Sequence, residues 1–133
     1  MPVLLKRKKK QWTVWHDLIY IHLTLAHAAD DELEDEELAA IVENMYAWMP
    51  HLEPRQMAEQ VRFVMDDYSK GIDMPKLQKC IERVHAQMPH EKRTAILRDL
   101  NDIARADGTI HENEELMLKR LGEAWDVTLP GAP

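Results

Sequence analysis

Apolar residues recur every three or four positions over six stretches of the chain, which is the period of an α-helix. The first stretch predicts a helix over residues 12–29, and its broad apolar stripe is typical of a central, buried helix. The main apolar positions of this stripe are Trp12, Trp15, Leu18, Ile19, Ile21, Leu23, Leu25 and Ala26. Five further stripes follow, and their main positions are Leu38, Ile41, Val42, Met45, Trp48 and Met49; Met57, Val61, Val64, Met65 and Tyr68; Leu77, Ile81, Val84 and Met88; Ile96, Leu100, Ile103 and Ala104; and Leu118, Leu121 and Trp125.

Prolines separate the predicted helices and do not interrupt them. Pro50 ends the second helix, and Pro89 separates the fourth from the fifth. Pro54 and Pro75 suit the first turns of the third and fourth helices. No two-residue hairpin turn lies between alternating apolar and polar segments. The chain is therefore predicted to be an all-α, compact bundle of about six helices with short loops.

Length and composition fit this prediction. A chain of 133 residues suits one domain, and 45% apolar with 31% charged residues is a globular profile. We expect a basic arm over residues 1–11, a helical domain over residues 12–126 and a tail over residues 127–133.

The net charge of −7 is unevenly distributed. Lys6 to Lys10 is an unbroken run of five cations, so the rest of the chain has 12 Lys+Arg against 24 Asp+Glu, a net of −12. An acidic body is a poor ligand for nucleic acid, and we expect it to bind cationic proteins or metal ions instead. The basic run is either a solvated tail or a segment that contacts anionic lipid or nucleic acid.

Cys80 is the single cysteine, which excludes a disulfide framework and a thiolate cluster and fits a reducing cytoplasm. Residues 11–17 are too polar for the core of a secretory signal, and no stretch has the roughly 18 apolar residues of a membrane span. We expect a cytoplasmic protein, peripheral to the inner face of the membrane if the arm binds lipid.

Two halves of the chain overlay when one is shifted by 77 residues. The matched pairs are Ile19 and Ile96, Leu23 and Leu100, Ala29 and Ala106, Asp30 and Asp107, Leu33 and Ile110, Glu37 and Glu114, Ile41 and Leu118, and Trp48 and Trp125. These pairs include both core positions and an acidic turn. The sequence thus predicts a helix–acidic turn–helix unit that occurs twice, with two helices between the copies.

The acidic turns supply the candidate site residues. In one interpretation these carboxylates accept backbone N–H bonds and cap the helices that follow. In the other they converge on a divalent ion, Ca²⁺ or Mg²⁺, and flanking histidines would favour Zn²⁺. A histidine beside acidic residues is more commonly a surface ion partner. The candidate metal ligands are Asp30, Glu37, Asp107 and Glu114, flanked by His27 and His111.

Residues 107–114 match the second half of an EF-hand loop. The first half is missing, because Ile103 and Arg105 occupy the positions of its first two carboxylates. Ca²⁺ needs about six to eight oxygen ligands, so one such turn alone cannot form the cage. An EF-hand is therefore excluded.

The paired motifs resemble those of the TerB-like family of tellurite-resistance and stress proteins. They are Ala-Asp-Gly-Thr-Ile with Glu114, and Ala-His-Ala-Ala-Asp-Asp-Glu-Leu with Glu37, and the resemblance covers residues 18–125. The first copy departs from the family pattern at Asp31, where glycine is usual. The resemblance implies an all-helical bundle with paired acidic motifs, proposed metal sensing and association with membrane-bound stress complexes. It also implies binding or scaffolding rather than catalysis.

Two other functions stay open. The same carboxylates would serve a metal-dependent hydrolytic enzyme, but no Gly-rich phosphate loop, GxSxG motif or Cys/His nucleophile pattern is present. Related modules in J-domain co-chaperones imply a regulatory role in a chaperone system. Seven of the eight residues from Asp30 to Glu37 are acidic, which indicates either a solvated face or a docking patch for a basic partner.

Overall fold

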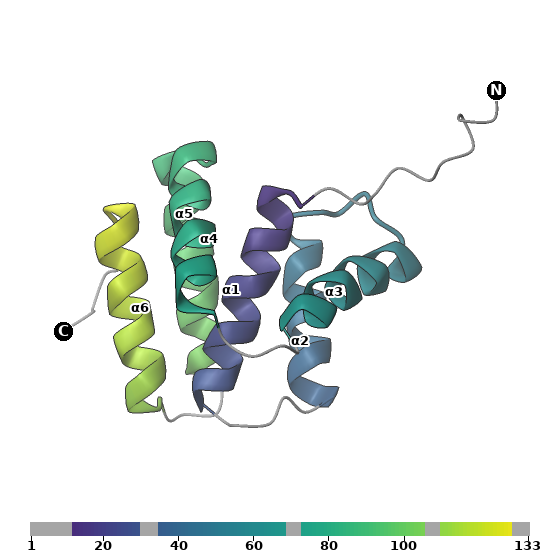
Figure 1. Ribbon diagram of the computed structural model, residues 1–133, viewed down its shortest axis with the longest axis horizontal. Helices are drawn as coiled ribbons and strands as arrows, with labels where there is room; N and C mark the ends of the chain where they lie inside the picture. Colours follow the sequence, from purple (N-terminus) through teal and green to yellow (C-terminus); the bar gives the residue numbers. More distant parts are fainter. Residues whose placement is uncertain (1–11, 30–34, 69–72, 106–109, 129–133) are drawn as a thin grey trace.

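The protein is all-α, as predicted. The computed structural model describes residues 12–29, 35–68, 73–105 and 110–128, and within these ranges it contains six helices and no strand (Figure 1). The predicted arm and residues 129–133 of the predicted tail lie outside the described residues. The helices are α1 (Val14–Ala29), α2 (Asp35–Tyr46), α3 (Pro54–Tyr68), α4 (Met74–Gln87), α5 (His90–Ala104) and α6 (Glu112–Trp125).

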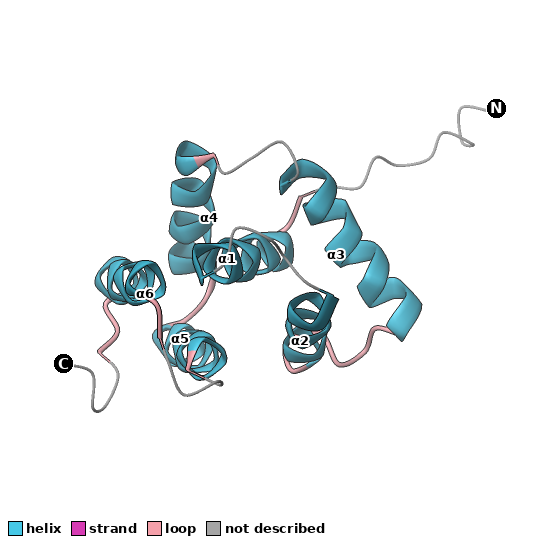
Figure 2. Cartoon of the chain, turned by 90° about the horizontal axis from the view of Figure 1, so that it is seen from below, coloured by secondary structure: helices cyan, strands magenta, loops and turns pink. Residues whose placement is uncertain are grey.

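The first helix is the centre of the bundle. α1 packs against each of the other five helices, and Figure 2 shows it between the pair α2 and α3 and the group α4, α5 and α6. Burying a large apolar side chain stabilises a fold by about 1.5–3 kcal/mol, so this helix contributes much of the core energy. The hydrophobic side chains of α1 that are at most 1% exposed are Leu18, Ile19, Tyr20, Ile21, Leu23 and Leu25.

The internal repeat is visible in the helix positions. Moved along the chain by 77 residues, α2 would begin at residue 112, where α6 begins, and α1 would begin at 91, next to the start of α5 at residue 90. The matched core residues Ile19 and Ile96 are both fully buried, as are Leu23 and Leu100. The repeat therefore places the same core positions in two structural units.

Most helix boundaries follow the local signals in the sequence. Asp73 precedes α4 and its carboxylate accepts the N–H of Lys76 at 3.1 Å. α2 is the exception, because it ends at Tyr46 although we expected it to reach Pro50. Proline disfavours helical geometry in the residue before it, and the chain leaves the helix through a tight turn in which Trp48 N–H donates to the Met45 carbonyl at 3.0 Å.

Candidate metal site at the acidic turns

Glu114 caps the last helix. It is the third residue of α6, is only 5% exposed, and its Oε1 accepts the backbone N–H of His111 at 3.1 Å. This satisfies an N–H group at the start of the helix, where the helix dipole also favours a negative charge. The capping role predicted for Glu114 is therefore confirmed.

Of the other three predicted ligands, the structure describes only the backbone of Glu37. Glu37 lies in the first turn of α2, at the position equivalent to Glu114 in α6. Asp30, Asp107 and the side chain of Glu37 lie outside the described residues. Whether the four carboxylates converge on one ion therefore stays a prediction.

The helix ends that flank the two acidic turns share one end of the bundle. α1 and α5 both end, and α2 and α6 both begin, at the lower end of the molecule in Figure 1. α1 also packs against both α5 and α6. The fold thus brings the two matched units together with the same orientation.

The flanking histidines differ in their surroundings. His27 is partly buried, and its Nδ1 lies 2.7 Å from the hydroxyl of Tyr68. Burial, with a smaller effect of Tyr20, raises the pKa of Tyr68 to about 12, so the phenol stays neutral and holds the imidazole in place. His111 is exposed at the start of α6. Among the residues that the structure describes, no three His, Cys, Asp or Glu side chains form a group able to hold a metal ion.

An ion pair that the sequence does not reveal joins α1 to α4. Asp17 is fully buried, and both its carboxylate oxygens accept bonds from the Arg83 guanidinium at 2.8–3.1 Å. The indole N–H of Trp12 donates to the same carboxylate at 2.7 Å. Nearby Cys80 is buried, and burial together with the Asp17 charge raises the pKa of its thiol to about 12. The thiol therefore stays protonated at neutral pH and is a poor nucleophile.

A buried histidine joins α1 to α2. His22 is 2% exposed, and its Nδ1 lies 2.6 Å from the Leu18 carbonyl, which can only accept a hydrogen bond. The proton therefore sits on Nδ1, and Nε2 accepts from the side-chain amide of Asn44 at 2.9 Å. Burial lowers the pKa of His22 from 6.5 to about 4.

His22 is expected to make the fold sensitive to acid. Its pKa is lower in the folded chain than in the unfolded chain, so its stabilising contribution is complete above about pH 6.5 and is lost as the pH falls towards 4. Urea unfolding near pH 7 and near pH 4.5 should show a loss of stability about 2 kcal/mol larger in the wild type than in His22→Gln. Equal losses in the two proteins would show that this imidazole does not control the acid response.

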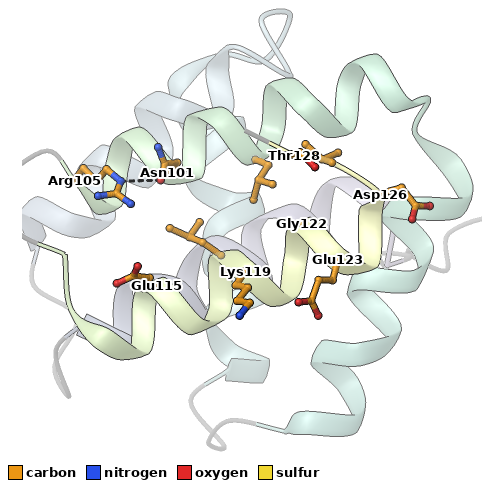
Figure 3. Close-up of a pocket in the computed structure, with 11 residues that line it drawn as sticks. Asn101, Arg105, Glu115, Lys119, Gly122, Glu123, Asp126 and Thr128 are labelled. Atoms are coloured by element: carbon orange, nitrogen blue, oxygen red, sulfur yellow. Dashed lines mark hydrogen bonds between the residues drawn. The ribbon is translucent and has the colours of Figure 1, made fainter. Parts of the chain in front are cut away.

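A cavity lies between α5, α6 and the segment that follows α6. Its volume is about 390 Å³, near the lower end of the range for ligand pockets. Arg105 and Glu115 lie at one end and Asp126 at the other, as Figure 3 shows. A Cβ added to Gly122 would lie 3.0 Å from the Val127 carbonyl, so glycine lets the chain cross α6 closely here. The lining residues are Leu97, Asn101, Arg105, Glu115, Leu118, Lys119, Gly122, Glu123, Asp126, Val127 and Thr128.

Comparison with known protein families tests the resemblance drawn from the paired acidic motifs. The sequence model of the family described as tellurite resistance protein TerB matches residues 18–128, which is most of the chain and both acidic turns. The chain belongs to the TerB family. The resemblance inferred from the paired acidic motifs is thus confirmed.

TerB membership establishes the family and agrees with the helical fold. Comparisons with curated proteins and with solved structures gave no match. In the described parts of the chain, no helix combines the length and the apolar character needed to cross a membrane.

Proposed function

We propose that this TerB protein is a non-catalytic interaction module of a tellurite-resistance or stress response, and that it binds one divalent cation between its two acidic turns. The observation that carries the proposal is the common orientation of the two repeat units, whose turn-flanking helix ends share one end of the bundle (Figure 1). Two turns together bring four carboxylates, Asp30, Glu37, Asp107 and Glu114, which one turn does not. Carboxylate oxygens suit Ca²⁺ or Mg²⁺, and a nitrogen from His27 or His111 would favour Zn²⁺.

The charge distribution supports a protein partner and a membrane contact. The acidic body attracts a cationic protein surface, and complementary charge chiefly sets the association rate and the specificity. The Lys6–Lys10 run carries the opposite charge and would hold the protein against an anionic membrane face from the cytoplasm. In this proposal the ion holds the two turns together and the surfaces recruit the partners.

Glu114 allows the capping role and the metal role to be separated. Gln at the third position of a helix keeps the capping bond but removes the charge that a hard cation needs. Calorimetric titration with Ca²⁺, Mg²⁺ and Zn²⁺ should show ion affinity at least about tenfold lower in Glu114→Gln than in the wild type.

Glu115→Gln is the matched control, since it makes the same charge change at the next, exposed carboxylate of α6. Its affinity should stay within about twofold of the wild type. If the wild type binds none of the three ions, or if both variants lose affinity equally, the metal proposal is wrong and Glu114 is a capping residue alone.

A further inference from the structure

Figure 2 shows α2 and α3 together on one side of α1. The side chains of these two helices line an apolar groove. Its volume is about 380 Å³. Leu38 and Val42 on α2 and Met65 on α3 are partly exposed in it, while Val61 on α3 is buried. The rim is polar, since Arg62 and Asp66 also line the groove.

The internal repeat shows that this apolar character is particular to the first copy. The residues equivalent to Leu38 and Val42 are Glu115 and Lys119, which are exposed on α6 and line the cavity in Figure 3. The helix–turn–helix unit therefore folds with charged residues at both positions. In the first copy the packing of α3 on α2 covers the apolar residues only in part.

The two helices that form the groove are acidic overall in sequence, while the groove lining itself has one cation, Arg62, and one anion, Asp66. α2 carries four acidic residues and no Lys or Arg. α3 carries three acidic residues and two Arg, so the two helices have two cations against seven anions, a net charge of −5. An apolar groove between two helices of net negative charge is complementary to a helix with an apolar stripe and basic flanks.

We propose that the α2–α3 groove docks a basic amphipathic helix of a partner protein, with apolar side chains inserted between Leu38, Val42 and Met65. This inference rests on the proposed function, because it locates the cationic partner of the acidic body. The negative charge of the two helices attracts the basic partner and raises its association rate. The groove selects a segment whose apolar residues share one face.

Two labelled synthetic peptides of about 15 residues test this proposal. Both contain only Leu and Lys, and the two peptides have the same composition. One places Leu at i, i+3, i+4 and i+7, so that Leu forms one face, and the other distributes Leu around the helix. Fluorescence anisotropy with the full chain should show the amphipathic peptide binding at least about tenfold more tightly than the scattered one.

The double variant Leu38→Glu with Val42→Lys gives the first copy the residues of the second and leaves the net charge unchanged. It should lower the affinity for the amphipathic peptide about tenfold and leave the scattered peptide unaffected. Circular dichroism checks its fold, and Met65→Gln is a milder change on the opposite wall that should act in the same direction. Lys119→Gln, outside the groove, should change neither affinity.

Three outcomes would overturn the inference, and each shows which part of it is wrong. If both peptides bind equally and neither groove variant alters binding, the acidic docking surface stands and the groove has no part in it. If neither peptide binds, both the docking surface and the groove are wrong. If removal of residues 1–11 strengthens peptide binding, the groove belongs to the chain's own basic run.

Discussion

Replacing Arg83 with Met is expected to lower the free energy of unfolding by about 3 kcal/mol. The Arg83 side chain is itself 39% exposed, so most of this loss comes from its partner, Asp17, which is fully buried and would lose its cation. The Trp12 indole would remain as a donor to the carboxylate, but it supplies one bond where the guanidinium supplies several. Chemical denaturation of the wild type and Arg83→Met measures the difference.

The double variant Asp17→Leu with Arg83→Met shows whether the loss of stability in Arg83→Met comes from the unpaired buried carboxylate or from lost packing. Removing both charges should recover most of the stability, because an apolar pair of similar size needs no compensating charge. If the double variant is as unstable as Arg83→Met alone, the loss comes from packing and not from the unpaired carboxylate.

Trp125→Ala is expected to destabilise the protein by about 4 kcal/mol. The Trp125 side chain is fully buried, and its indole N–H donates to the Ile81 carbonyl on α4 at 3.0 Å. Its loss would leave a large cavity between α4 and α6 and remove the hydrogen bond that the indole makes across them. The midpoint of thermal or urea unfolding reports the change.

Trp48 is the matched control, because it occupies the equivalent position of the first repeat unit. It is only partly buried, and its indole N–H has no hydrogen-bond partner among the described residues. Trp48→Ala should therefore destabilise by about 2 kcal/mol or less. Equal losses at the two positions would contradict the asymmetry seen between the copies.

The fold was predictable because its signals are local. Apolar periodicity predicted the six helices, and Pro54 and Pro75 lie in the first turns of α3 and α4 as expected, while Pro89 directly precedes α5. The capping role of Glu114 was predictable for the same reason, since its partner His111 is three residues away.

Contacts between distant segments were not predictable. Asp17 and Arg83 are 66 residues apart, and a single Asp within an apolar stripe does not indicate which cation will reach it. His22 likewise depends on Asn44, which lies on the next helix. The convergence of the acidic turns is a question of the same kind, because it depends on segments far apart in the chain.

Calorimetric titration of Asp30→Asn and Asp107→Asn tests whether the two acidic turns form one ion site. One turn belongs to each repeat unit, so a shared site predicts one ion per chain in the wild type and a similar loss of affinity, about tenfold or more, from either substitution. Unchanged ion affinity in one of the two variants would contradict the shared site, and so would the absence of binding in the wild type.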